Sequence, residues 1–322
     1  MLSIQYSPAP ERLEDCFALL DDSQSAFLCV ADGCGGLGSR RYPELNNQTG
    51  ASLAAGLVVE AASGWWRQGQ TTPHTLEQGQ KTLTALVPWL EQALNDFSRV
   101  HPQTGSRIVG SMQRELPTTL CMALSTQEGE SRQELCFVWA GDSRGYVLDG
   151  RGLHQCTQDH VRGQLNAFDS LYRDAPLSNL LSAGRTPRLS ARHLCVNRPC
   201  VVIVATDGAF GGLRTPMEME MMLIDTLLAA KTQAGWQRKI TTVLKKAAND
   251  DATLLMQPCG FETFEAMQRH FQIRRGFLQK QFITQARRKR ENLPYVEGRW
   301  QAYRQGYDWT EVSGDAACDW RI

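Results

Sequence analysis

Short apolar runs recur along the chain, and longer stretches between them carry apolar residues three and four positions apart. The short runs are typical of buried strands, and they predict strands at residues 27–30, 120–124, 136–139, 201–204 and 253–256. The longer stretches predict helices at residues 49–62, 81–100 and 218–231. Strands and helices are segregated more than alternated, which favours a layered α+β fold with sheets at its centre over a βαβ winding.

Two regions depart from this pattern. Residues 154–199 mix charged residues, Asn, Ser and Pro with short apolar patches, and they predict a flap inserted over the core. After residue 261 a long helical stretch becomes strongly basic until Pro294 breaks it. The basic residues are Arg274, Arg275, Lys280, Arg287, Arg288, Lys289 and Arg290. We therefore expect one catalytic domain at residues 1–257 and a helical, basic C-terminal extension at residues 258–322.

The basic stretch allows two interpretations. Charge runs on long helices are usually solvated faces, which is the simpler one. Docking of a phosphopeptide, an acidic partner or nucleic acid is the alternative.

Composition places the 322-residue chain among ordinary globular proteins, with 42% hydrophobic and 21% charged residues. Lys and Arg number 34, as do Asp and Glu, so the molecule as a whole does not attract nucleic acid or an anionic membrane. No signal sequence or membrane-spanning run is present, which predicts a cytoplasmic protein. The ten cysteines form no CxxC pair, which indicates reduced thiols and disfavours a structural zinc site.

Acidic residues stand at the ends of the predicted strands. Asp32 follows the first run, Asp142 follows the run at 136–139, and Asp207 follows the run at 201–204. Asp250 precedes the strand at 253–256, as expected if that strand runs antiparallel to the others. Asp-Gly is also a common turn, which is the alternative for any one of these positions. Together the acids predict a cluster at one rim of the sheets.

Carboxylates held close together repel one another unless a cation neutralises them. Oxygen ligands suit Mg²⁺ or Mn²⁺, and two such ions about 4 Å apart form the usual clamp for in-line attack on phosphorus. Gly33 follows Asp32 and would let the backbone approach closely, leaving its carbonyl able to bind metal. The sequence therefore predicts a centre with two Mn²⁺ or Mg²⁺ ions.

The same residues resemble, in order and spacing, the motifs of the PPM-type (type 2C) metal-dependent protein serine/threonine phosphatases, especially bacterial members. The matching segments are 30–36, 117–120, 139–145, 206–208 and 250–254. With Glu14 and Asp15 near the start, the resemblance extends from about residue 10 to residue 256.

The resemblance implies an α-β-β-α four-layer sandwich with the metal centre in a channel at one edge of the two sheets. It implies that Asp32 bridges two Mn²⁺ or Mg²⁺ ions and that Asp207 and Asp250 complete the first. A water between the ions would attack the phosphorus of phosphoserine or phosphothreonine in line, without a phosphoenzyme. Phosphorylated proteins would be the substrates, and a Ser/Thr kinase would oppose the enzyme. The sequence predicts no oligomeric state.

The resemblance also implies roles at the second ion and at a third, weaker one. The Gly33 carbonyl, and Glu14 through a water, would serve the second ion, with Asp15 supporting the ligands from behind. Asp142, in the Gly-Asp-Ser-Arg motif, would hold the third ion together with Asp207.

Three positions depart from the family pattern. Pro10 stands where members usually carry a phosphate-binding arginine, and Arg12 is the nearby candidate for that role. Cys34 stands where many animal members carry a histidine, which places a general acid there in doubt. Pro117 replaces a glycine before the paired threonines and should affect only the local turn. None of these changes removes a predicted metal ligand.

Two rival functions follow from other features. A non-catalytic PPM-like module that binds phosphoproteins or scaffolds a complex would keep the fold, but it would not need the whole acid set. The GxGxxG pattern at residues 33–38 suggests a dinucleotide-binding oxidoreductase, but no helix opens within the motif, because Pro43 and its neighbours intervene. Asp159-His160 resembles a dipeptide at the start of the family's flap, where it would order the turn.

Overall fold

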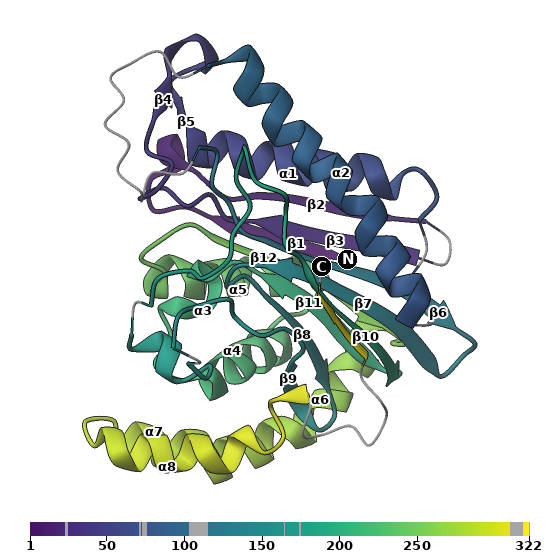
Figure 1. Cartoon of the computed structure of the whole chain (residues 1–322). Helices are drawn as coiled ribbons and strands as arrows, with labels where there is room; N and C mark the ends of the chain where they lie inside the picture. The colour runs from purple at the N-terminus through teal and green to yellow at the C-terminus, as the bar shows by residue number, and fades with distance from the viewer. Residues whose placement is uncertain are drawn as a thin grey trace.

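Two antiparallel sheets lie face to face and helices cover both outer faces in the computed structural model (Figure 1). It describes residues 1–22, 25–70, 72, 76–102, 115–163, 165–173, 175–309 and 318–321, with the side chains of 76, 77 and 318–321 left out. This arrangement confirms the predicted α-β-β-α four-layer sandwich. None of the helices described is long and apolar enough to cross a bilayer.

One sheet has five strands in the order β1-β12-β11-β8-β9, and every neighbouring pair is antiparallel. Its strands are β1 (Leu2–Tyr6), β8 (Arg144–Asp149), β9 (Gly152–Gln155), β11 (Cys200–Ala205) and β12 (Ala252–Cys259). Residues 201–204 and 253–256, both predicted as strands, lie within β11 and β12. The core of β11 is apolar on both faces because one face meets the second sheet and the other meets helices.

The other sheet has six strands in the order β13-β10-β7-β6-β3-β2, again antiparallel throughout. They are β2 (Cys16–Asp21), β3 (Ser25–Ala31), β6 (Leu120–Glu128), β7 (Arg132–Ala140), β10 (Ser190–Asn197) and β13 (Cys318–Arg321). The remaining three predicted strands lie within β3, β6 and β7. A small hairpin, β4 (Arg41–Tyr42) and β5 (Gln48–Thr49), precedes the first long helix.

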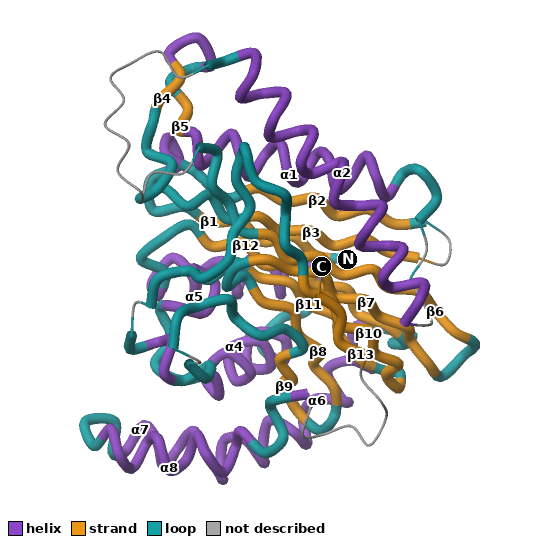
Figure 2. Tube along the Cα trace, in the orientation of Figure 1, coloured by secondary structure: helices purple, strands orange, loops and turns teal. Residues whose placement is uncertain are grey.

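Helices α1 (Gly50–Trp66) and α2 (Leu76–Val100) cover the six-stranded sheet, while α4 (Pro216–Leu228) and α5 (Gln233–Ala247) cover the five-stranded one (Figure 2). The three predicted helices correspond to α1, α2 and α4. Threonine side chains cap α1, α4 and α5, because Thr49, Thr215 and Thr232 each accept a backbone N–H of the first turn. Alternate residues of β3 fill two cores, with Leu28 between the sheets and Phe27 under α1 and α2.

The predicted flap at residues 154–199 is too wide at both ends. Residues 154 and 155 belong to β9, and residues 190–197 form β10, which pairs with β7 along its whole length. The described part of the irregular segment therefore comprises residues 156–163, 165–173 and 175–189, with a short 3₁₀ turn at Asp169–Leu171. Sequence patterning missed β10 because Arg192 and His193 interrupt its apolar run.

The predicted C-terminal extension is helical and packs closely on the sandwich. It contains α6 (Phe264–Leu278), a π-helical turn η4 (Gln279–Ile283), α7 (Thr284–Arg288) and α8 (Leu293–Arg304), before β13 joins the sheet edge. Its buried Phe271 and Trp300 belong to the same hydrophobic core as β11 and α4. Residues 310–317 and 322 of the predicted extension lie outside the described residues. The division at residue 257 stays a prediction, since the two parts share a core.

Candidate metal centre

The predicted acids converge where strands of both sheets end. Asp32 follows β3 of the six-stranded sheet, Asp207 follows β11 of the five-stranded sheet, and their carboxyl groups are close enough that each affects the pKa of the other. Asp142 follows β7 and raises the pKa of Asp32 electrostatically. Asp250 precedes β12 and acts on Asp207 in the same way. The fold therefore brings all four strand-end acids to one edge.

Paired threonines hold the backbone of Asp32 in place. The Thr119 backbone N–H donates to the Asp32 carbonyl at 2.8 Å, and the Thr118 hydroxyl donates to the same oxygen at 2.8 Å. In return, the Asp32 N–H donates to the Thr119 hydroxyl at 3.1 Å. The hydroxyls of Thr119 and Ser143 are 2.7 Å apart, which ties the residue next to Asp142 into the same network. These threonines position the acid.

Asp15 is buried behind the other acids. Its Oδ2 accepts hydrogen bonds from the hydroxyls of Thr206 at 2.8 Å and Thr253 at 2.7 Å. Its Oδ1 is also buried, and none of the residues that the structure describes donates a hydrogen bond to it. Burial is the main cause that raises the pKa of Asp15 to about 7. A buried carboxylate oxygen without a donor is suited to a cation or to a water that a cation holds.

Glu14 is half-buried and lies beside Asp251. The Glu14 N–H donates to Asp251 Oδ2 at 2.6 Å, and the Thr49 hydroxyl donates to Glu14 Oε1 at 2.5 Å. Asp250 is exposed, and its Oδ1 accepts the Asp251 N–H at 2.8 Å. Asp251 is the second acid of the Asp250-Asp251 pair, and the sequence pattern predicts a role only for Asp250. Its position in the pair before β12 was the available signal, but which of two adjacent acids turns inward depends on the fold.

The electrostatics of this edge favour a cation. Burial first, and then the neighbouring carboxylates, hold the pKa of Asp32 well above its usual range and raise that of Asp207. The same causes raise the pKa of Asp142 to about 7. A divalent ion would reverse this effect, and a set of carboxylate oxygens suits Mg²⁺ or Mn²⁺ better than softer metals. The residues present therefore fit the two-cation centre that the sequence predicts.

Two glycines allow the backbone to pack tightly around the acids. A Cβ on Gly33 would lie 2.5 Å from the Ala51 carbonyl oxygen, and one on Gly208 would lie 1.9 Å from the Asp251 carbonyl oxygen. Neither distance is possible for a real side chain, so both positions require glycine. A metal-binding role for the Gly33 carbonyl stays a prediction.

A cavity of about 400 Å³ reaches Asp15 and is lined by two arginines. Arg12 is exposed on a 3₁₀ turn at Pro10–Arg12, and Arg41 comes from the β4–β5 hairpin. Asp15 and Thr49 line the same cavity, and the Arg41 charge acts on Glu14. Sequence reasoning considered Arg12 but missed Arg41, because nothing local in a two-residue strand marks it.

Cys34 lies among the same acids. Burial and then the charges of Asp32 and Asp142 raise the pKa of its thiol above the usual range. A thiol is also a soft ligand, so Cys34 is poorly suited to binding a hard cation.

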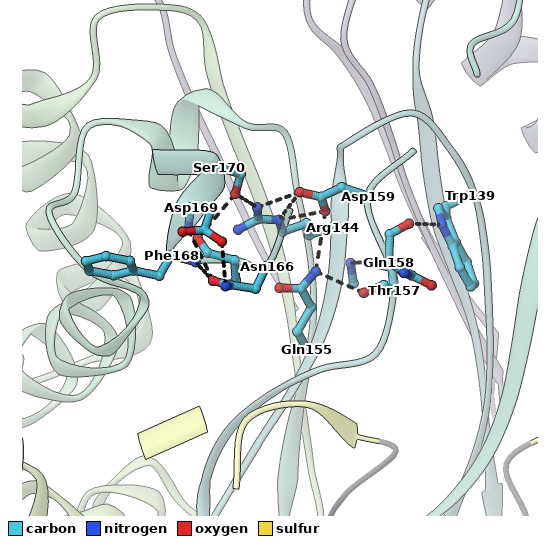
Figure 3. Close-up of polar contacts among 12 residues, drawn as sticks. Trp139, Arg144, Gln155, Thr157, Gln158, Asp159, Asn166, Phe168, Asp169 and Ser170 are labelled. Carbon is cyan, nitrogen blue, oxygen red and sulfur yellow. Dashed lines mark hydrogen bonds and ion pairs between the residues drawn. The ribbon is translucent and has the colours of Figure 1, made fainter. Parts of the chain in front are cut away.

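The flap is anchored beside the centre by the arginine of the Gly-Asp-Ser-Arg motif. Figure 3 shows the Arg144 guanidinium pointing at Asp159, with Ser170 beside it. The Trp139 indole N–H donates to the Gln158 carbonyl at 2.7 Å at the other end of this network (Figure 3). Asp159 therefore orders the start of the flap, as its sequence context predicted.

A second group of metal-capable side chains lies at the far ends of β6, β7 and β10. The ligand atoms of Glu128, Glu134 and Cys195 all lie within 4.8 Å of one another, and no other three such residues among those described are as close. The strand-end aspartates are therefore more widely spaced than this triad. His193 Nε2 lies 2.5 Å from Glu134, and the positively charged Arg132 contacts Cys195. A cation bound by this triad would be repelled by the positive charge of Arg132.

Comparison with known proteins agrees with this arrangement. The family described as Protein phosphatase 2C matches residues 10–245. A search of curated proteins finds no match. The serine/threonine phosphatase Stp1 of Staphylococcus aureus is 15% identical with a TM-score of 0.57, the alignment covering 80% of this chain and 94% of Stp1.

Two other solved structures are similar in fold. The PPM Ser-Thr phosphatase MsPP of Mycobacterium smegmatis, in complex with cacodylate, has a TM-score of 0.51 at 15% identity, covering 79% of this chain and 96% of MsPP. The catalytic domain of the phosphatase PstP, in complex with two manganese ions, has a TM-score of 0.50 at 16% identity, covering 79% and 95%. With its sheets, its strand-end acids and the family match over residues 10–245, this chain belongs to the protein phosphatase 2C family of metal-dependent protein serine/threonine phosphatases.

Proposed function

We propose that Asp32, Asp207 and Asp250 hold the cations with which this phosphatase hydrolyses phosphoserine and phosphothreonine in proteins. The observation that carries the proposal is that Asp32 and Asp207, which follow strands of different sheets, lie close enough for each carboxyl to shift the pKa of the other. Partly buried carboxylates held this close are unfavourable without a counter-charge, so their convergence has a physical reason if cations bind there.

The remaining acids would complete the coordination. Glu14, through a water, and the Gly33 carbonyl would serve the second ion, and Asp142 would share a weaker third ion with Asp207. Asp15 would orient this set, since its Oδ2 is already held by Thr206 and Thr253. Asp251 fixes the Glu14 backbone and belongs to the same supporting group.

When bound, the cations would acidify a water and neutralise charge on the phosphoryl oxygens. The chain's own residues would orient the substrate. Arg12 and Arg41 line the cavity beside Asp15, and either guanidinium can pair with a phosphate through two hydrogen bonds. We assign the role of the family's phosphate-binding arginine to this pair, because Pro10 occupies the usual position.

Hydrolysis of p-nitrophenyl phosphate and of a phosphothreonine peptide tests the proposal, with Mn²⁺, with Mg²⁺ and with EDTA. We expect metal-dependent turnover that Asp207→Asn abolishes while the protein stays folded, because the change removes a ligand charge at constant volume. Asp21 is an exposed acid at the end of the β2–β3 pair away from Asp32. Asp21→Asn is therefore the matched control and should keep full activity. A folded Asp207→Asn protein with near wild-type turnover would falsify the site. Silence of the wild type with metal shown to bind would favour the non-catalytic phosphoprotein-binding module.

We also propose that the enzyme acts in the cytoplasm against a Ser/Thr kinase. The nine cysteines whose side chains are described are all unpaired, which suits a reducing compartment. Co-expression with a candidate kinase, followed by measurement of substrate phosphorylation, tests the pairing.

A further inference from the structure

A second cavity, of about 250 Å³, lies where the flap, the start of α4 and the α7–α8 turn meet. Tyr172 contributes from the flap, Arg214 and Glu218 from the start of α4, and Arg287 and Arg290 from the C-terminal extension. None of these side chains is needed by the metal centre, so the cavity is separate from the site already described.

The lining is positively charged. Three arginines face one carboxylate, that of Glu218. Glu218 is itself engaged, since its Oε2 accepts the Arg214 N–H at 3.0 Å and its Oε1 lies 3.7 Å from Arg287 Nε. Arg290 meets Glu291 at 3.0 Å, but both side chains are more than half exposed, so this pair is weak. The cavity therefore keeps an excess of positive charge.

The structure sorts the basic residues of the C-terminal extension into two groups. Arg274 and Arg275 are paired with acids of α4, at 2.6 Å from Glu220 and 2.9 Å from Asp225. Lys289 lies over the ring of Tyr295 at 4.3 Å. The Arg274 pair, whose Glu220 is fully buried, anchors the extension on α4, whereas the Arg275 pair is partly exposed and contributes little. Arg287 and Arg290 line the cavity instead, and with side chains 58% and 65% exposed both are accessible to a partner.

The cavity is close to the metal centre along the chain. Arg214 follows Asp207 by seven positions, and the short helix α3 (Gly208–Gly211) lies between them. The Tyr172 hydroxyl donates to the Arg214 carbonyl at 2.9 Å, which joins the flap to this segment. The seven residues from Asp207 to Arg214 can span at most about 25 Å. An extended substrate peptide would cover the same distance with about eight residues. Figure 1 shows α3 and the α7–α8 turn on the same side of the molecule.

We propose that this cavity docks an acidic segment of the phosphoprotein substrate, within about eight residues of the phosphorylated position. The inference rests on the proposed function and names its substrate class. Guanidinium groups pair with carboxylates through two parallel hydrogen bonds, so Glu- or Asp-rich segments are the complementary partner. Each exposed pair is worth about 0.2–1 kcal/mol, so two pairs correspond to about a 2- to 30-fold gain in kcat/KM.

Two phosphothreonine peptides test the proposal, identical except that one carries three acidic residues five to eight positions from the phosphothreonine and the other carries serines there. We expect the wild type to prefer the acidic peptide at least threefold in kcat/KM, chiefly through a lower KM. Arg287→Ala with Arg290→Ala should abolish the preference, and Arg287→Glu with Arg290→Glu should reverse it. Lys280→Ala with Arg288→Ala, which lie in η4 and α7 but outside the cavity lining, should keep it.

Two further readouts separate this inference from the proposed function. Hydrolysis of p-nitrophenyl phosphate reports the metal centre in every variant, and anisotropy of a fluorescent acidic peptide reports docking without turnover. An inactive centre with intact peptide docking would overturn the proposed function alone. Active enzyme with no acid preference, or a preference that survives in the Arg287 and Arg290 variants, would overturn the docking site. Arginine-dependent binding of a single-stranded oligonucleotide in place of the peptide would overturn it in favour of nucleic acid.

Discussion

Arg144 forms a two-point ion pair with Asp159, with Nε 2.9 Å from Oδ1 and Nη2 2.6 Å from Oδ2. Both side chains are buried, at 2% and 6% exposure. Nη2 also donates to the Ser170 hydroxyl at 2.6 Å, and the guanidinium lies 4.1 Å from the centre of the Phe210 ring in α3. One arginine therefore joins β8 to the flap and to the helix that follows Asp207.

Asp159→Ala should destabilise the protein strongly. It leaves the Arg144 charge buried without a partner, which typically costs about 3–5 kcal/mol. Urea unfolding at pH 7 measures the change. Arg99→Ala, which breaks an exposed pair with Asp96, is the control and should change stability by less than about 1 kcal/mol. Equal effects of the two substitutions would show that the buried pair does not hold the flap.

Removal of divalent cations should reverse the effect of Asp32→Asn on stability. A carboxyl with a raised pKa in the folded state makes the protein less stable as pH rises from the unfolded pKa towards the folded one. Ionisation of Asp32 therefore opposes folding at pH 7.5 without metal. In EDTA the asparagine variant should therefore melt at a higher temperature than the wild type. Saturating Mn²⁺ should raise the wild-type Tm by several degrees and the variant's less. An equal Mn²⁺ shift in both proteins would contradict Asp32 as a ligand.

Asp149 should stabilise the protein at neutral pH and lose this effect in acid. His154 places Nε2 2.9 Å from Asp149 Oδ1 and Nδ1 2.5 Å from the Gly306 carbonyl, so the pair connects β8 and β9 to the residues after α8. Hydrogen bonding and charge from His154 outweigh burial and hold the pKa of Asp149 well below its usual range. A depressed pKa adds stability above the unfolded pKa of about 4, and this is lost as pH falls through the folded value.

Asp149→Asn should therefore lower the free energy of unfolding by about 1–3 kcal/mol at pH 7. The difference from wild type should shrink steadily below pH 4, as followed by urea unfolding between pH 7 and pH 3. A difference that is constant over this range would mean that the carboxylate charge plays no part.

Glu220 should anchor the C-terminal helices to the sandwich. It is fully buried in α4 and accepts from Arg274 Nε at 2.6 Å and from the Tyr303 hydroxyl at 2.5 Å. Glu220→Ala removes the acceptor of two buried donors and should cost about 3–5 kcal/mol, whereas Tyr303→Phe should cost about 1–2 kcal/mol. Thermal unfolding measures both. Arg275→Ala, in a half-exposed pair with Asp225, should have little effect, and a large one would indicate a different anchor.

Much of the site was determined by the sequence itself. Apolar runs covered on both faces can only be central strands, so β3, β6, β7, β11 and β12 were predictable from local pattern. Acids directly after such strands, as at Asp32 and Asp207, must lie at a sheet edge, because the strand carries them there. The order and spacing of these motifs was sufficient to suggest the family before any geometry was known.

Tertiary structure decided the rest, because it depends on partners far away in the sequence. Arg192 and His193 conceal β10, and their polar groups are satisfied by the Cys156 carbonyl and by Glu134. The fold decides that Asp251, of the two acids before β12, supports Glu14. The packing of the β4–β5 hairpin and α1 likewise brings Arg41 and Arg12 into one cavity. Likewise, the basic run at 274–290 is uniform in sequence. Only the docking of α6 to α8 on α4 divides it into a largely buried anchor, Arg274, and the cavity-lining arginines, since side-chain pairing requires a neighbour that local sequence does not specify.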